Sequence, residues 1–394
     1  MTDIALAQPH TAETPGERLL TIAERVGKEV AGPAAYDVDR EARFPSEAFD
    51  ALKKEGVLTA LVPVELGGMG ATLTDISNAI RVLARYCSAT GAALAMHTIE
   101  IFLLLKYGTT PALRALLSEI VDKQLLIANA NSEAGLGGDV MRSIAALEPD
   151  GDGWRLDKQS YAVSYGLSAD LIACTARRNP DAAETDQVSV LFRAAKFSLD
   201  PTSGWDTLGL RGTCSTGIHL TGHVTDDDIF PVPFADIANG GGGQLRHVLL
   251  TAVWTGLAEA ALEEAHAAVR VSARRSIGKT PMSAMRLAEM AADVQAARST
   301  LAEALRRVEA AAAADDLENI DLIMTLRNVK VITTTTAVHT ATKALQICSI
   351  NGFRRGKEYR LERVIRDAHG GLIMVGNDRY LDENAEMLAV RKSI

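Results

Sequence analysis

A glycine-rich segment at residues 131–139 is the first stretch whose residue types could do chemistry. It reads NSEAGLGGD and follows an apolar run at residues 125–130. Glycine-rich turns expose backbone N–H groups that can bind the oxygens of a phosphate. The segment is not G-x-x-x-x-G-K-S/T and opens no βαβ unit, so both standard nucleotide fingerprints are excluded. From the residues alone, a tight turn and a phosphate-binding loop both stay open.

Three other polar residues stand in places where a ligand could reach them. Ser164 follows an alternating stretch at residues 160–163, and a small hydroxyl at a strand end can hydrogen-bond a heteroaromatic ligand. Arg211 lies in a glycine-flanked loop, and Arg274 is the first of two arginines that end a long helical stretch. An arginine there can bind a phosphate or complement the C-terminal end of the helix dipole. Each residue also has a purely structural explanation, as a turn serine or a surface arginine.

The histidines and cysteines give no metal-binding pattern. His219 and His223 are four residues apart in a strand-like region, where they share a face but gain no further ligands. The cysteines are widely spaced, at Cys87, Cys174, Cys214 and Cys348. With no C-x-x-C pair, the sequence predicts neither a zinc site nor a disulfide framework.

The elements that must position these residues begin with helices. Apolar residues recur at helical spacing, which predicts helices over residues 17–30, 46–55, 72–86, 89–107 and 109–121. The stretch at 89–107 is apolar almost throughout, so we expect it to be a buried helix.

Short β-rich runs follow from about residue 124, separated by turn clusters. They cover residues 125–130, 144–147, 154–156, 171–175, 188–192 and 217–220. The runs are too close together for crossover helices, which favours an antiparallel sheet or a small barrel over a Rossmann sheet.

Helices return in the last third of the chain. They are predicted over residues 244–276, 283–314, 320–351 and 377–392, and such long amphipathic helices suit a four-helix bundle. The glycine run at 239–243 predicts a flexible connector. The whole order indicates an α+β fold. We expect a flexible tail at 1–14, a helical domain at 15–123, a β domain at 124–238 and a helical domain at 239–394.

Composition and charge exclude several classes of protein. With 47% hydrophobic and 23% charged residues in 394, the chain is not expected to be disordered. Acidic residues outnumber basic ones by 50 to 41 and aromatics make up 5%, which argues against nucleic acid as a partner. The first residues lack the pattern of a signal peptide and no apolar run is long and continuous enough for a membrane span. We therefore expect a soluble cytoplasmic protein without a membrane partner.

Taken in order, the segments resemble the acyl-CoA dehydrogenase family of flavoproteins, from about Glu17 to Arg391. The most specific matches come last: ALQICSINGF at 344–353 is similar to A-L-Q-I-x-G-G-x-G-Y, and ERVIRDA at 362–368 fits E-R-x-x-R-D-A. More diverged matches to family motifs lie at residues 132–139, 162–164, 209–213, 274–278 and 284–290.

The resemblance implies an N-terminal helical domain, a central β-barrel and a C-terminal four-helix bundle. It also implies FAD between barrel and bundle, a small-molecule substrate such as an acyl-CoA or acyl-carrier thioester, and a homotetramer or homodimer. In the family, part of the cofactor site comes from a neighbouring subunit, which here concerns Arg274 and the segment around Gln346. The positions that correspond to cofactor contacts are Ser132, Gly137, Gly138, Ser164, Arg274, Ile277, Gln346, Ile350, Gly352 and Asn377.

The usual catalytic base of the family is missing. Most members carry a glutamate nine residues after the arginine of R-D-A, and Val375 stands there. A minority carry it at the start of the first bundle helix, where this chain has Arg246, followed by His247. The catalytic residue is therefore unknown from the sequence. Asp378, the nearest carboxylate, and His97, on the apolar helix, are candidates, each with a structural alternative as a helix first-turn residue and a packed core histidine. His97, Arg246 and His247 are also predicted to bind substrate.

Three functions fit these residues. The first, which the full-length resemblance favours, is α,β-dehydrogenation of an acyl thioester by an FAD oxidoreductase with a relocated base. The second is a flavin-dependent monooxygenase of the same fold, because relatives that activate oxygen and hydroxylate sulfur, nitrogen or aromatic carbon need no carboxylate base. The third is a non-catalytic partner subunit of a dehydrogenase.

Overall fold

The fold is seen in a computed structural model, which describes residues 13–275, 280–374 and 376–391 of the 394-residue chain. Ile277 and Val375 fall outside the described residues, as does most of the tail predicted at residues 1–14. The predicted domain boundaries stay predictions, although the order of helices, strands and helices is the one expected.

The N-terminal part is built from helices. They are α1 (Pro15–Val26), the π-helical turn η1 (Gly27–Ala31), α2 (Gly32–Glu41), α3 (Ser46–Lys54), the short 3-10 turns η2 (Val57–Thr59) and η3 (Val64–Leu66), α4 (Leu73–Tyr86), α5 (Ser88–Tyr107) and α6 (Pro111–Lys123). Helices α1 and α4 begin at capping boxes. In α4, Thr72 Oγ1 accepts from the Asp75 N–H while the Asp75 carboxylate accepts from the Thr72 N–H. Both groups would otherwise lack a partner at the helix start, so the boundary is fixed locally.

Helix α5 is the buried helix that the sequence predicted. It is the one described helix that is long and apolar enough to cross a membrane by length and composition, and 83% of its most apolar stretch is buried inside the fold. Such burial is typical of a core helix. It packs against α4, α8 (Gly243–Arg275) and strand β1 (Ile127–Asn129), so any polar residue it carries lies where the three parts of the chain meet.

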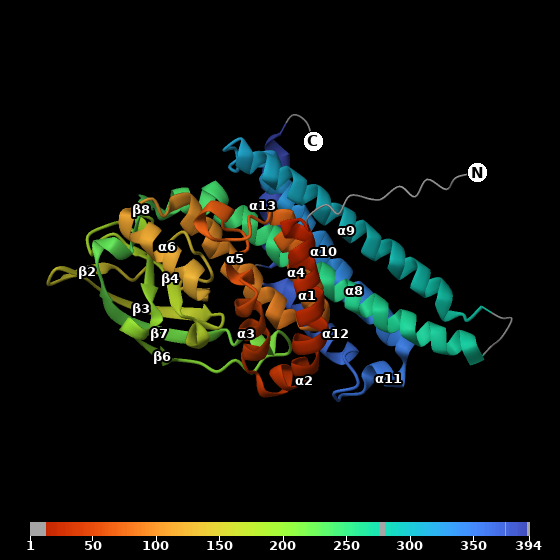
Figure 1. The fold of residues 1–394 in the computed structure, drawn as a ribbon. Coiled ribbons are helices and arrows are strands. Elements are labelled where there is room, and N and C mark those ends of the chain that lie inside the picture. Colours follow the sequence, from red (N-terminus) through yellow and green to blue (C-terminus); the bar gives the residue numbers. More distant parts are fainter. Residues whose placement is uncertain (1–12, 276–279, 375, 392–394) are drawn as a thin grey trace, which may run out of the picture.

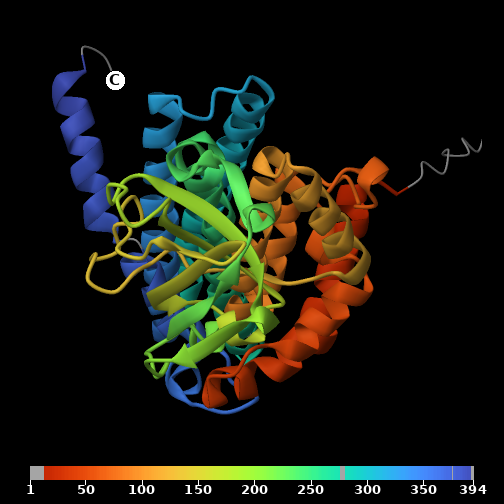
Figure 2. The same cartoon turned by 90° about the vertical axis from the view of Figure 1, so that its left-hand side faces the viewer.

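The central region consists of two four-stranded sheets within the described residues. The first sheet has the strand order β1–β4–β5–β8, with β4 (Leu171–Arg177), β5 (Gln187–Arg193) and β8 (Ile229–Pro233). The second sheet has the strand order β2–β3–β7–β6, with β2 (Leu147–Asp150), β3 (Gly153–Val163), β6 (Phe197–Pro201) and β7 (Thr216–Val224). Short 3-10 turns join them: η4 (Gly166–Ser168), η5 (Ala194–Lys196), η6 (Arg211–Thr213) and η7 (Asp226–Asp228). The sheets lie beside the N-terminal helices and on one side of the bundle (Figures 1 and 2).

The sheets differ from the prediction in two ways. Strand β1 pairs with β4 in parallel, so the sheets are not wholly antiparallel. Strands β6 and β8 were not predicted, because β6 is mostly exposed and β8 holds two prolines, so neither shows a clear apolar alternation.

The C-terminal part is a set of long helices that reaches away from the sheets (Figure 1). After α7 (Phe234–Ile237) and the π-helical turn η8 (Ala238–Gly242) come α8, α9 (Ser283–Ala313), α10 (Ile320–Cys348), α11 (Ile350–Phe353), α12 (Leu361–Ile373) and α13 (Asn377–Val390). Helix α10 packs on α8, α9, α12 and α13. This confirms the helical C-terminal part and adds α12, which the sequence showed only as a motif.

The motif at residues 362–368 joins α12 to two other parts of the chain. Arg366 forms a two-pronged ion pair with the buried carboxylate of Asp39 in α2, with distances of 2.6 and 2.9 Å. Asp367, also buried, accepts from Ser88 Oγ (2.5 Å) and from the Leu210 N–H (2.7 Å). Bidentate arginine–carboxylate pairs are geometrically specific, so this motif fixes the bundle against the N-terminal helices and the sheet loops.

The glycine run predicted as a flexible connector is instead a packed kink. Gly240, Gly241 and Gly242 are buried in η8, between α7 and α8. A Cβ on Gly240 would lie 2.0 Å from Tyr107 Oη, and Gly241 has a φ of +144°. Glycine is needed because the Tyr107 hydroxyl, which donates to the Gly240 carbonyl (3.0 Å), approaches the backbone so closely.

Candidate functional site

Two of the predicted flavin contacts are brought together by strand β3. Ser132, on the loop after β1, donates from Oγ to the Ala162 carbonyl (3.0 Å) and accepts from the Ala162 N–H (3.2 Å). Ser164 lies two residues further along, and its hydroxyl is 2.8 Å from the hydroxyl of Ser215. Both serines are half-buried, and both lie at the end of β3.

The glycines of the same loop are open to a ligand. Gly137 and Gly138 have φ values of +58° and +83°, and a Cβ on either would meet no atom within 4 Å. Their backbone N–H groups donate to no other group in the part of the chain that the structure describes. The phosphate-binding alternative for this loop is therefore sterically available.

A buried ion pair holds the base of this loop. Lys158 of β3 is fully buried and donates from Nζ to Glu133 Oε2 (3.1 Å) and to the Thr175 carbonyl (2.7 Å). Glu133 also accepts from Ser143 Oγ (2.7 Å) and the Ala145 N–H (2.7 Å). Burial alone would raise the pKa of Glu133, but Lys158 and these donors outweigh it and lower the pKa. Glu133 therefore stays ionised, and its bonds to Lys158, Ser143 and Ala145 fix the loop that carries Ser132.

Glu100 is the acidic group that sequence reasoning missed. It lies on α5, is 8% exposed, and accepts through Oε1 from Asn129 Nδ2 (2.8 Å). The Asn131 N–H donates to Asn129 Oδ1 (3.2 Å), which fixes Nδ2 as the donor. Oε2 of Glu100 makes no hydrogen bond with a described residue. A lone acid in the apolar stretch at 89–107 was the signal that could have identified it.

The surroundings of Glu100 change its proton affinity. Burial raises its pKa to about 7, against smaller lowering effects of the Asn129 hydrogen bond and the positive charge of Arg246. A carboxyl with a pKa near neutrality can exchange a proton at physiological pH, which is what a general base or acid requires.

Arg246 and His247 lie near the start of α8, and the positive charge of Arg246 acts on this carboxyl. Arg246 is half-buried and forms no hydrogen bond or ion pair within the described ranges. The ring of His247 packs edge-on against Tyr380 of α13, with 4.9 Å between centroids. Burial, followed by the charges of Arg246, Arg327 and Lys330, lowers the pKa of His247 to about 3. His247 is therefore neutral, and the positive charge here comes from its neighbours.

Lys330 of α10 also lies close to Tyr380. It is 5% exposed, donates from Nζ to Asn377 Oδ1 (2.6 Å), and sits 5.3 Å from the centroid of the Tyr380 ring. Burial lowers its pKa to about 8, so it is mostly protonated at neutral pH. Asn377 in turn donates to Thr334 Oγ1 (3.1 Å). Sequence reasoning also missed Lys330, because one lysine in a long amphipathic helix gives no signal.

These residues form one contiguous group, which we call the buried polar cluster. Its members are Glu100, Asn129, Arg246, His247, Lys330, Thr334, Asn377 and Tyr380. They come from α5, β1, α8, α10 and α13. Through Asn129 and Asn131 the cluster reaches the loop that carries Ser132, so predicted cofactor contacts and ionisable side chains share one region.

The structure assigns His97 a packing role instead of the predicted catalytic or substrate-binding one. Its side chain is fully buried, the Ile127 N–H donates to Nδ1 (3.1 Å), and Nε2–H donates to the Leu58 carbonyl (2.8 Å). Both ring nitrogens are therefore occupied by backbone groups of β1 and η2. Burial lowers the pKa of His97 to about 4, so the ring is neutral.

Because His97 is buried in its neutral form, we expect the folded protein to lose stability in acid. The unfolded ring titrates near 6.5, so the unfolded state binds more protons between pH 6.5 and 4 and stability falls as the pH falls. Between pH 7.5 and 5 this difference in proton binding lowers the free energy of unfolding by about 2 kcal/mol. We expect urea unfolding of His97→Gln to show a pH dependence smaller by that amount. The exposed His339→Gln is the control, and equal pH slopes for wild type and His97→Gln would contradict the assignment.

Asp378 does not join the buried polar cluster. Its side chain is exposed in the first turn of α13 and forms no ion pair among the described residues. The helix-terminus alternative holds, because a carboxylate there is stabilised by the helix dipole.

The other predicted cofactor residues lie elsewhere in the chain. Arg274 is exposed at the far end of α8, and Gln346 and Ile350 are exposed at the junction of α10 and α11, beside the buried Gly352. In Figure 1 both places are on the opposite side of the bundle from the sheets. One chain does not bring these residues to Ser132, so their predicted role requires a second chain.

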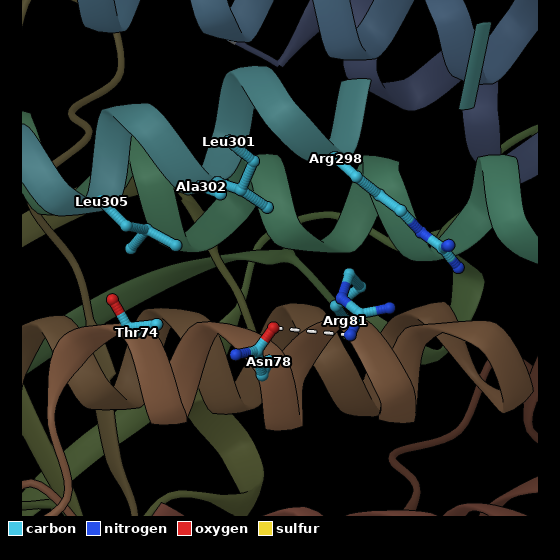
Figure 3. A pocket seen from close by; sticks show the side chains of 7 residues that line it. All are labelled: Thr74, Asn78, Arg81, Arg298, Leu301, Ala302 and Leu305. Atoms are coloured by element: carbon cyan, nitrogen blue, oxygen red, sulfur yellow. Dashed lines mark hydrogen bonds between the residues drawn. The ribbon is translucent and has the colours of Figure 1, made fainter. Parts of the chain in front are cut away.

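Two cavities among the described residues are lined by residues outside the cluster. A cavity of about 350 Å³ lies between α4 and α9 (Figure 3), and its Arg81 and Arg298 both bind the buried Glu259. The single negative charge of Glu259 therefore offsets only part of theirs. A second cavity, of about 340 Å³, borders β2 and β3 and includes Glu133. Among the described residues, no group of three or more His, Cys, Asp or Glu could hold a metal ion.

Among the curated proteins, the chain is 29% identical to amino sugar nitrososynthase RubN8 from Streptomyces rubradiris, over 91% of this chain and 86% of that protein. It is 24% identical to a cyclohex-1-ene-1-carbonyl-CoA dehydrogenase from Syntrophus aciditrophicus, over 88% of this chain and 83% of that protein. Among solved structures, FMN-bound TdsC from Paenibacillus sp. A11-2, a dibenzothiophene monooxygenase, matches with a TM-score of 0.82 at 20% identity, over 94% and 97% of the two chains.

Family models match both ends of the chain. The acyl-CoA dehydrogenase N-terminal domain matches residues 17–124, and the acyl-CoA dehydrogenase C-terminal domain matches residues 245–385. These matches agree with the fold, in which helices come before and after the sheets. The C-terminal match includes the motif of α12 whose Arg366 pairs with Asp39. The chain belongs to the acyl-CoA dehydrogenase family.

Proposed function

We propose that the protein is a flavin-dependent monooxygenase that oxidises the nitrogen of a small-molecule amine. The observation that carries this proposal is the charge of the buried polar cluster. Arg246 stands where some family members place a glutamate base, and the protonated Lys330 is bonded to Asn377, two residues after Val375. Abstraction of the acidic proton of a thioester needs a carboxylate base, and cations at both places do not provide one.

The residues at the end of β3 fit a flavin. Asn131 Oδ1 is buried and accepts no hydrogen bond in the described chain, so a ring N–H donor would satisfy it. Ser132 follows Asn131 in the chain and bonds to Ala162, two residues before Ser164. The N–H groups of Gly137 and Gly138, which have no partner among the described residues, suit a phosphate. A bound reduced flavin would supply the two electrons that activate oxygen. We propose FAD, with Arg274 and the Gln346 segment contributed by a neighbouring subunit of a homotetramer or homodimer.

Glu100 has the properties that amine oxidation asks of the protein. An amine is protonated in water and must lose that proton before its nitrogen lone pair can react. A buried carboxylate attracts an ammonium group, and with a pKa of about 7 it can accept the proton. Asn129 holds Oε1, which leaves Oε2 for the substrate. The nitrososynthase similarity supports this chemistry, since RubN8 is named for nitroso formation on an amino sugar.

The stoichiometry of oxygen uptake and product formation can be measured directly. Converting an amine to a hydroxylamine places one oxygen atom of O2 in an N–H bond and releases the other as water, with two electrons and two protons consumed. We expect the purified protein to bind flavin, and the flavin released by denaturation to be identified as FAD or FMN by chromatography. With a nicotinamide-dependent flavin reductase and an amino-sugar panel, we expect hydroxylamine formation coupled to oxygen uptake. A protein that cannot be reconstituted with any flavin would overturn the proposal.

Dehydrogenation of an acyl thioester is the second candidate, and Glu100 is the observation that favours it. A carboxylate on α5 could act as the relocated base. This function predicts that an acyl-CoA bleaches the bound flavin without oxygen or external reductant. Amine oxidation predicts no bleaching under these conditions, so anaerobic titration with an acyl-CoA panel separates the two.

A further inference from the structure

We infer that the substrate carries an anionic group in addition to its amine, and that Arg246 binds this group. The substrate class is thus a zwitterion, in which Glu100 receives the ammonium and Arg246 receives the anion. The inference rests on the proposed function, because it takes the amine partner of Glu100 from it.

Arg246 differs from the other arginines that lie between elements. Arg81 binds both oxygens of Glu259 (2.6 and 2.7 Å), Arg366 binds both oxygens of Asp39, and the buried Arg363 donates to the Tyr86 carbonyl (3.4 Å). Arg246 is half-buried yet has no such partner in the described ranges. A partly desolvated guanidinium without a counter-ion costs free energy, and an anionic ligand removes that cost.

Glu100 and Arg246 are close enough to interact but do not bond to each other. Helices α5 and α8, which carry the two groups, pack against each other, and the charge of Arg246 lowers the pKa of Glu100. They nevertheless form no ion pair, whereas ion pairs elsewhere in the fold close to 2.5–3.1 Å, as in Arg25–Glu55 and Lys158–Glu133. The opposite charges are held apart on α5 and α8, so a ligand with both charges can touch each of them.

The groups around Arg246 favour an anion over a cation. His247 beside it is neutral, Lys330 adds a positive charge from α10, and Arg327 adds another, although its guanidinium is paired with Glu383 (2.5 Å). Tyr380 is buried between them, and burial raises its pKa to about 12, so it carries no negative charge. Glu383 is already paired with Arg327. The charged groups that act on His247, the neighbour of Arg246, are all cations.

The test measures binding to the flavin-loaded protein by isothermal titration calorimetry, so that turnover is not needed. The zwitterionic probes are β-alanine, γ-aminobutyrate, 6-aminohexanoate and O-phosphoethanolamine, each compared with a matched alkylamine and a matched carboxylate or phosphate. We expect at least one zwitterion to bind about 10- to 100-fold more tightly than either single-charge partner, as charge-assisted hydrogen bonds give. Preference for O-phosphoethanolamine over the carboxylates would identify a phosphate as the anion.

Three variants separate the two charges. Arg246→Met should reduce zwitterion affinity to that of the amine, and Arg246→Lys should retain part of it. Arg306→Met, which changes an exposed arginine of α9 paired with Glu303, should leave affinity unchanged. If no zwitterion binds better than its matched amine, or if Arg246→Met changes nothing, the inference falls. Amine oxidation by Arg246→Met at the wild-type rate would sink only this inference, whereas loss of oxygenation with every amine in the wild type would sink the proposed function.

Discussion

Replacing Glu100 with glutamine is expected to lower amine turnover by about 100- to 10,000-fold, the range for loss of a general acid–base group. Glutamine keeps the size and the acceptor for Asn129 Nδ2 but cannot take a proton. Flavin content should not change, because Glu100 touches neither Ser132 nor Ser164 through a hydrogen bond. The measurement is hydroxylamine formation with reduced flavin supplied, alongside flavin absorbance.

The pH dependence of this variant is a separate readout. Since the reactive form of Glu100 is the carboxylate, wild-type turnover should rise as the pH passes through about 7 and then level off. Glu100→Gln should lack that rise. Stability moves in the opposite direction: the folded pKa of this acid is raised, so wild-type stability is lost as the pH rises from 4.5 to about 7. At pH 8 the variant should therefore unfold at a temperature equal to or above that of the wild type.

Asp378→Asn is the matched control for Glu100→Gln. It removes the carboxylate nearest in sequence to Val375. The Asp378 side chain is exposed at the start of α13. We expect turnover to stay within about twofold of wild type, with a stability change below about 1 kcal/mol from the lost helix-dipole interaction. If Asp378→Asn abolished turnover and Glu100→Gln did not, the base would be Asp378 and the role given to Glu100 would be wrong.

Lys158→Met is expected to have the largest effect on stability. Removing Lys158 leaves the carboxylate of Glu133 buried without its counter-ion, which costs about 3–5 kcal/mol. The effect should spread to the cofactor, because Glu133 adjoins Ser132 on the glycine-rich loop. We expect a lower urea midpoint with an unchanged m-value, together with weaker flavin retention on gel filtration.

Two further variants show whether the cost comes from an unpaired charge. In Lys158→Met/Glu133→Gln no charge is left, and the amide oxygen can still accept from the Ala145 N–H, so most of the lost stability should return. Arg142→Met removes an exposed partner of Glu184 and should cost far less stability than Lys158→Met, because exposed ion pairs contribute little. Equal losses in the single and double Lys158 variants would mean that packing, not charge, is responsible. Because the pKa of Glu133 is lowered, the pair's contribution is present above pH 4.5 and is lost as the pH falls below that.

Helix positions were the most predictable part of the fold, because their signals are local. The apolar stretch at 89–107 and the threonine cap at residue 72 specify α5 and α4 from neighbouring residues alone. Strands β6 and β8 were not predicted, because pairing with β7 and β5 decides them. The run at 239–243 was misinterpreted, since composition does not show that Tyr107 packs against its backbone.

The site was predictable only where a motif carried it. Ser132 was identified by resemblance and Ser164 also by its position after a strand, and both lie at the end of β3, where Ser132 bonds to Ala162. His97 was also proposed, but the sequence does not show whether backbone groups bond to the ring nitrogens of a histidine on an apolar helix. In the structure they do. Glu100 and Arg246 are 146 positions apart in the chain, so no local pattern links them.

By itself, the sequence determined the family, the order of helices and strands, and the loss of the usual glutamate at Val375. These follow from residue types and short spacings, which the fold does not alter. The tertiary structure decided which ionisable groups share the site and in what protonation state. Burial on α5 moves the pKa of Glu100 to about 7, and Arg246 on α8 is left without a partner among the described residues. Desolvation and long-range charge act through space, so the chemistry of this protein is fixed only when its helices pack.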